Sequence, residues 1–140
     1  MKTAFFYLHL FGFLTAGIIL TAGEAISQEQ FEMKTADTTY TMKKYYLCLL
    51  NRGPKQDIDS VTLSKIQKGH LEHITQLAKD GKICIAGPCD DDADLRGIMV
   101  FTVSGQLEAE QLAAEDPAVK AGRLSVEIHP WWAAKGSVLK

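Results

Sequence analysis

One amphipathic stretch organises the chain: SVTLSKIQKGHLEHITQLAKD, residues 60–80. A turn of about 100° per residue predicts a helix with one apolar arc and one charged arc. The apolar arc holds Leu63, Ile66, His70, Leu71, Ile74, Leu77 and Ala78. His70 lies near the middle of that arc, and a buried imidazole needs a hydrogen-bond partner or loses its charge. The pattern therefore predicts that another segment places a polar group opposite His70.

Turn formers and capping residues divide the rest of the chain. Gly81 and Gly122 suit helix ends, and Asp116-Pro117 suits a helix start. A second helix is expected over residues 104–114, followed by one more turn that begins at Asp116. The expected strands are residues 45–50, 83–86, 97–103 and 124–128, from their apolar or alternating patterns.

The element order βαββαβ predicts an α+β fold, a ferredoxin-like sandwich. Its four-stranded antiparallel sheet carries two helices on one face. The strands at residues 45–50 and 97–103 are apolar on both sides, which is typical of strands that are covered on both sides. Because no helix remains for the second face, we expect a homodimer with the two sheets packed face to face.

The chain divides into four expected segments. Residues 1–25 have the positive start, apolar run and small-residue cut site of a secretory signal peptide. The alternative is an uncleaved anchor, since about 18 apolar residues is the lower limit for a membrane span. Residues 26–43 are polar and are expected to form a linker, residues 44–132 the ferredoxin-like domain, and residues 133–140 a C-terminal tail. The mature protein is expected to be exported, periplasmic or secreted, and free of the membrane.

Charge and cysteine content limit the possible partners. The formal net charge is −2, which gives no electrostatic case for binding nucleic acid or an anionic membrane. The chain has three cysteines and no Cys-x-x-Cys pair, so a redox motif is unsupported. Cys48 and Cys84 lie in strand-like runs and are interpreted as packing residues, with a disulfide as the alternative.

His70 and Asp116 are the candidate catalytic residues. A carboxylate that holds an imidazole orients it, selects one tautomer and stabilises the protonated ring. Such a pair is the minimal apparatus for general acid–base chemistry near neutral pH. The alternatives are structural: His70 can be a core histidine bonded to a backbone carbonyl, and Asp116 can be only a helix cap.

Metal and calcium sites are not supported by the sequence. His70 and His73 form a His-x-x-His pair, but a metal site needs three or four ligands, and no cofactor is expected. The acidic loop at residues 90–94 lacks the glycine and the bidentate glutamate of a calcium loop. It is interpreted as a solvated hairpin. Trp131 and Trp132 can line a pocket or seal a dimer edge.

Several short motifs follow one another in order along the chain. They are KKYYLCLLNRGP (43–54), QKGHLEHI (67–74), GKICIAGP (81–88), DLRG (94–97), EDPAVKAG (115–122) and HPW (129–131). Together they resemble the YciI (YCII-related) family over residues 43 to about 132. The resemblance implies a dimeric α+β barrel built from ferredoxin-like subunits. It also implies an active site formed by a helix histidine and the aspartate of an Asp-Pro pair, here His70 and Asp116.

The sequence leads to two functional hypotheses from different classes. The first is an exported enzyme that uses His70 and Asp116 for acid–base chemistry on a small organic molecule. The second is a non-catalytic ligand-binding dimer or a structural module. If the protein binds a ligand, with or without catalysis, the candidate ligand-binding residues are His73, Gly87, Pro88 and Arg96.

Overall fold

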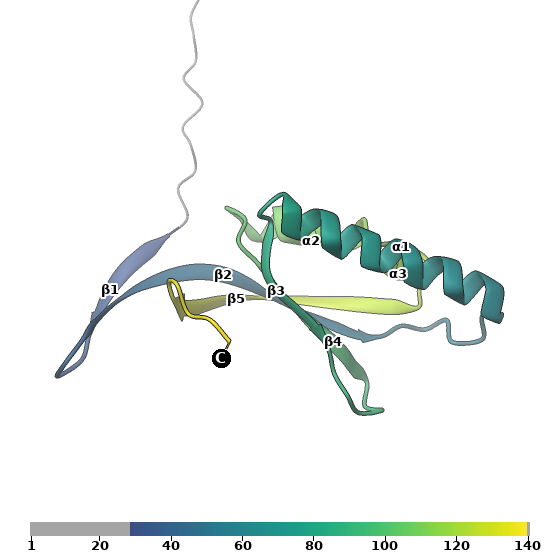
Figure 1. Ribbon diagram of the computed structural model, residues 1–140, viewed down its shortest axis with the longest axis horizontal. Helices are drawn as coiled ribbons and strands as arrows, with labels where there is room; N and C mark the ends of the chain where they lie inside the picture. Colours follow the sequence, from purple (N-terminus) through teal and green to yellow (C-terminus); the bar gives the residue numbers. More distant parts are fainter. Residues whose placement is uncertain (1–28, 140) are drawn as a thin grey trace, which may run out of the picture.

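The computed structural model describes residues 29–139, which form one antiparallel sheet with three helices on one face (Figure 1). The predicted signal peptide lies outside the described residues. The strands are β1 (Gln30–Lys34), β2 (Thr39–Arg52), β3 (Ile83–Pro88), β4 (Leu95–Phe101) and β5 (Leu124–Ala134). The helices are α1 (Ser60–Lys79), α2 (Gln106–Ala114) and α3 (Pro117–Lys120). No helix within residues 29–139 is both long enough and apolar enough to span a bilayer.

β2 is the central strand and organises the sheet. Along one edge it pairs with β5. Along the other edge its first part pairs with β1 and its second part with β4. β3 pairs with the far edge of β4. Every pairing is antiparallel. The predicted α+β, ferredoxin-like fold is confirmed, with five strands instead of the four expected.

The additional strand corrects the interpretation of residues 26–43 as a linker. Phe31 pairs across the hairpin with Met42, and Met33 with Tyr40. The Phe31 ring also packs edge-on against Trp132, with ring centroids 4.8 Å apart. The few apolar residues of this hairpin alternate with threonine, glutamate and lysine in a segment of low overall hydrophobicity, so the pattern did not predict a strand.

The C-terminal boundary also differs from the expectation. β5 continues to Ala134, so the first two residues of the predicted tail at 133–140 belong to the sheet. Lys43 and Met42 of the lengthened β2 pair with Ala133 and Ala134 and thereby extend β5. The tail prediction was wrong at this end for the same reason as the linker prediction, namely the longer β2.

The helices bury one face of the sheet. Cys48 on β2 lies opposite Met99 on β4, and Tyr46 lies opposite Phe101, which places these four side chains on one face. All four are buried, together with Ala109 and Ala113 of α2. Leu47 and Leu49 point to the other face of the sheet and are partly exposed.

Both glycine-terminated helices end in the same way. Gly81 and Gly122 have positive φ values of 67° and 72°, in the left-handed region that glycine adopts without strain. After α1, Lys82 N–H donates to the Leu77 carbonyl, and after α3, Arg123 N–H donates to the Ala118 carbonyl. These are the bonds of a Schellman motif, and they fix the direction in which the chain leaves each helix.

Candidate functional site

His70 and Asp116 meet across the interface between α1 and α3. The distance between His70 Nδ1 and Asp116 Oδ2 is 2.7 Å. His70 is 9% exposed and Asp116 is 0% exposed. The polar group that the helical pattern required opposite His70 is therefore the carboxylate of Asp116.

Asp116 uses its two oxygens for two different contacts. Oδ1 accepts the backbone N–H of Ala118 at 2.7 Å and so caps α3, whose first residue is Pro117. Oδ2 is the atom that accepts from His70. The helix-cap reading and the histidine-partner reading of Asp116 are thus both correct, because the cap geometry aims the second oxygen at α1.

Gly69 allows the two helices to approach closely enough for this contact. A Cβ atom at Gly69 would lie 3.1 Å from Pro117 Cγ and 3.3 Å from Pro117 Cβ, tighter than ordinary packing. The residue next to His70 is therefore a glycine where α1 crosses the start of α3. This role of Gly69 was not predicted from the sequence, although a glycine in a helix interior is a signal of close packing.

The hydrogen bond determines which nitrogen of His70 is available for chemistry. An ionised carboxylate only accepts, so Nδ1 carries the proton that is donated to Asp116. In the neutral ring Nε2 is then a free acceptor. Nε2 has no partner among residues 29–139, where every fully buried polar side-chain atom has one, so Nε2 must be accessible. This is the arrangement of a general base that a carboxylate orients.

A cavity of about 420 Å³ lies against His70. It is bounded by α1, by the ends of β2, β3 and β4, and by the segment that leads from α3 into β5. Its lining residues are Leu50, Arg52, Gln56, Gln67, His70, Leu71, Ile74, Ala86, Gly87, Pro88, Cys89, Arg96, Gly97, Ile98, Ala118, Arg123 and Leu124. The volume lies within the range of small-molecule sites, about 300–1,000 Å³.

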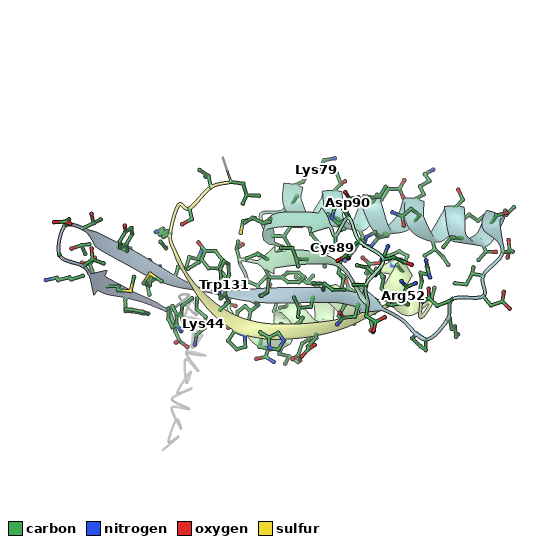
Figure 2. All side chains as sticks on the ribbon, turned by 90° about the horizontal axis from the view of Figure 1, so that it is seen from below. Lys44, Arg52, Lys79, Cys89, Asp90 and Trp131 are labelled. Carbon is green, nitrogen blue, oxygen red and sulfur yellow. The ribbon has the colours of Figure 1, made fainter. Side chains whose placement is uncertain are left out.

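The structure brings together most of the predicted site residues. His70, Gly87, Pro88 and Arg96 all line the cavity. Asp116 lies behind His70 rather than in the cavity wall. Figure 2 shows Arg52 and Cys89, two further lining residues, well away from Trp131 along the sheet.

His73 is placed elsewhere, and its assignment as a ligand-binding residue is not supported by this geometry. Its Nε2–H donates to the backbone carbonyl of Leu112 at 2.9 Å and ties α1 to α2. His73 does not line the cavity. His73 therefore links α1 to α2, whereas His70, one helical turn away, lines the cavity.

The cysteines differ sharply in their surroundings. Burial, with a smaller contribution from the charge of Asp116, raises the pKa of the Cys48 thiol to about 12. Cys48 is therefore an inert packing residue. Cys84 is exposed, so its interpretation as a packing residue is wrong for the single chain, and all three cysteines are free thiols.

Three arginines, Arg52, Arg96 and Arg123, line the cavity, and only Arg96 was identified from the sequence. Arg52 Nη2 lies 2.8 Å from Asp92 Oδ1, and Arg52 Nε lies 3.6 Å from Asp94 Oδ1. Arg96 donates to the Asp91 carbonyl at 2.8 Å. The acidic loop at residues 90–94 therefore holds two of the arginines. Within residues 29–139, no group of three or more His, Cys, Asp or Glu side chains could hold a metal ion.

Comparison with known proteins identifies the family of the chain. No curated protein matches the chain. Among solved structures, the chain is similar to 5-chloro-2-hydroxyhydroquinone dehydrochlorinase (TftG) from Burkholderia phenoliruptrix AC1100, in complex with 2,5-dihydroxybenzoquinone. The two share 20% sequence identity with a TM-score of 0.47, over 62% of this chain and 92% of the other. The YCII-related domain model matches residues 44–132, a span that contains α1, α3 and the whole cavity wall. The chain therefore belongs to the YCII-related domain family.

Proposed function

We propose that this protein is an enzyme that transfers protons on a small organic molecule bound in the cavity beside His70. His70 Nε2 accepts a proton from the bound molecule and returns it at a second position. Asp116 keeps Nδ1 protonated before the transfer and stabilises the imidazolium after it. Family membership supports a role with small molecules but does not name the reaction.

The single observation that carries this proposal is the asymmetry of the two ring nitrogens of His70. Nδ1 is fixed by a carboxylate that is itself completely buried, and Nε2 is accessible at the wall of a cavity. His73 provides the contrast within the same helix, since its Nε2 is occupied by a backbone carbonyl. A histidine that served only packing would resemble His73.

Proton transfer can be tested before the substrate is known. The protein is incubated in D₂O with a panel of small ketones and lactones, each paired with an analogue that carries a carboxylate, and ¹H NMR follows the loss of C–H signals. We expect at least one compound to exchange, and His70→Gln to slow this exchange about 100-fold or more, because general acid–base catalysis contributes that much.

The matched control is His129→Gln. His129 forms an exposed pair with Glu127, with 3.1 Å between Nε2 and Oε1, and it lies outside the cavity. This variant should exchange at the wild-type rate. If no compound exchanges, or if His70→Gln exchanges as fast as His129→Gln, proton transfer by His70 is refuted.

The second candidate function is ligand binding without turnover, and the apolar content of the cavity favours it as the alternative. Leu50, Leu71 and Ile74 supply apolar wall area to which a guest can bind without any chemistry. Saturable binding in the same NMR panel without any His70-dependent exchange would favour this function over the first.

We further propose that two copies pack through the helix-free face of the sheet. Leu47 and Leu49 of β2 lie opposite Val100 and Ile98 of β4 on that face, an apolar stripe on the central strands. Leu47→Arg should give a monomer in sedimentation equilibrium. The control Leu107→Arg, at an exposed leucine of α2, should leave the assembly unchanged. A wild-type protein that sediments as a monomer would refute the dimer.

Export is a separate proposal that rests on the first 25 residues of the sequence alone. Mass spectrometry of protein recovered from the native host should show a chain that begins at Ile26. An intact Met1 start in the mature protein would contradict cleavage.

A further inference from the structure

The cavity wall is cationic in a chain that is acidic overall. The chain has 15 lysines and arginines against 17 aspartates and glutamates. The cavity wall nevertheless contains Arg52, Arg96 and Arg123, and no aspartate or glutamate. Positive groups concentrated in one concave site attract a negatively charged ligand.

Two of the arginines already have protein acceptors. Arg52 pairs with Asp92 and Asp94, and Arg96 donates to the carbonyls of Asp91 and Ala93. These contacts hold the two guanidinium groups and offset part of their charge. They leave less attraction for a ligand than a free arginine would provide.

Arg123 differs from the other two. No residue within 29–139 forms an ion pair or a hydrogen bond with its guanidinium group. Its backbone is nevertheless fixed, because its N–H donates to the Ala118 carbonyl and its own carbonyl accepts from Gly53 N–H, both at 2.9 Å. A Cβ at Gly53 would lie 2.3 Å from the Gly122 carbonyl oxygen, so the backbones are in tight contact here. Arg123 therefore combines an anchored main chain with an unpaired guanidinium, on a residue that lines the cavity.

We propose that the natural ligand is a small organic carboxylate whose oxygens pair with Arg123. Its apolar body lies against Leu50, Leu71 and Ile74, and its reacting carbon lies toward His70 Nε2. A planar guanidinium matches a carboxylate through two parallel hydrogen bonds, which favours this anion over a point-charge contact. The inference rests on the proposed function, because it names the substrate class of the same cavity.

Leu71 supports the same assignment. It lies on the apolar arc of α1 but is 54% exposed, and it lines the cavity. An exposed apolar side chain and an unpaired arginine that line the same cavity are the combination that a molecule with an apolar body and one anionic end would cover.

The test uses two pairs of probes that differ in charge and little in shape: benzoate with benzamide, and hexanoate with hexanamide. Dissociation constants come from ¹⁵N-HSQC titrations of the full-length protein. For the wild type we expect each carboxylate to bind about tenfold more tightly than its amide, since a charged acceptor forms the stronger hydrogen bonds. Arg123→Gln should abolish this preference, and Arg123→Lys should retain part of it.

Lys120→Gln is the matched control, because it removes an exposed cation of α3 that does not line the cavity. It should keep the full preference for carboxylates. Equal affinity for acids and amides in the wild type, or an unchanged preference in Arg123→Gln, would overturn the inference. So would loss of the preference in Lys120→Gln to the same extent.

The outcome separates the two proposals. His70→Gln should still prefer carboxylates even though it no longer exchanges protons. A preference for carboxylates without any proton exchange would refute the enzymatic proposal and support the anion site. Exchange that depends on His70 but occurs only with uncharged compounds would support the enzymatic proposal and refute the anion site.

Discussion

Replacing Asp116 with alanine tests whether one buried side chain stabilises both a helix end and His70. The substitution removes the cap on Ala118 N–H, which costs about 1 kcal/mol of unfolding free energy. It also leaves the buried Nδ1–H of His70 without its acceptor, at a further cost of about 1–3 kcal/mol. The sum is about 2–4 kcal/mol.

Asp116→Asn separates the two effects. The amide oxygen can still cap α3, and the amide nitrogen can donate to Nδ1, so we expect a loss of about 1 kcal/mol or less. This contact reverses the tautomer of the neutral ring, however, and places the proton on Nε2. The variant should therefore remain folded while proton exchange falls about 100-fold.

Urea unfolding followed by circular dichroism measures the stability of both variants, and the D₂O assay measures exchange. The control is Asp59→Ala, which removes the exposed cap of α1, where the carboxylate accepts from Val61 and Thr62 N–H without contacting a histidine. Asp116→Ala should be clearly less stable than this control. Equal losses in the two alanine variants, or an Asp116→Asn protein as unstable as Asp116→Ala, would refute the double role.

Three further outcomes follow from the contacts described above. Gly69→Ala should reduce the rate of proton exchange about tenfold, because the added Cβ pushes against Pro117 and displaces His70. The free energy of unfolding should change by less than about 1 kcal/mol, because the gain in helix propensity offsets that contact. An unchanged exchange rate would contradict this prediction. The hydrogen bond and charge of Arg52, with the charge of Arg96, lower the pKa of the Asp92 carboxyl. The ion pair between Asp92 and Arg52 therefore stabilises the fold above the ordinary carboxyl pKa of about 3.9. This stabilisation is lost as pH falls through the lowered pKa of Asp92 in the folded protein. A carboxyl ¹³C titration should show that pKa rising in Arg52→Gln, and an unchanged value would contradict the pairing. Cys48, with its pKa raised to about 12, should resist iodoacetamide at pH 8 until the protein unfolds, and peptide mass spectrometry would reveal any labelling in the native state.

Local signals in the sequence account for much of the fold. The spacing of apolar residues along α1 placed His70 inward, and glycine and Asp-Pro signals located the ends of α1 and α3. These features depend on interactions between residues only a few positions apart, which periodicity and capping rules capture. The hairpin of β1 and β2 was not predicted, because it is recognised by the pairing of its two backbones and not by a hydrophobic pattern in the sequence.

The candidate site depended on contacts that are distant in the sequence. Residues alone gave no reason for Asp116 to lie beside His70; that pairing came from the family resemblance. His73 lies one helical turn from His70, and nothing local in the sequence shows that the Leu112 carbonyl occupies its Nε2. Arg52 and Arg123 were not identified because nothing local shows that a strand end and a helix exit face the same cavity.

The two oxygens of Asp116 have a consequence for how activity is lost on heating. Because one oxygen closes the first turn of α3 while the other orients His70, fraying of that turn and misalignment of the imidazole are a single event. Inactivation should therefore coincide with local opening at residues 116–121, which amide hydrogen exchange can follow. A population of molecules with an intact α3 and a misaligned His70 has no structural basis here.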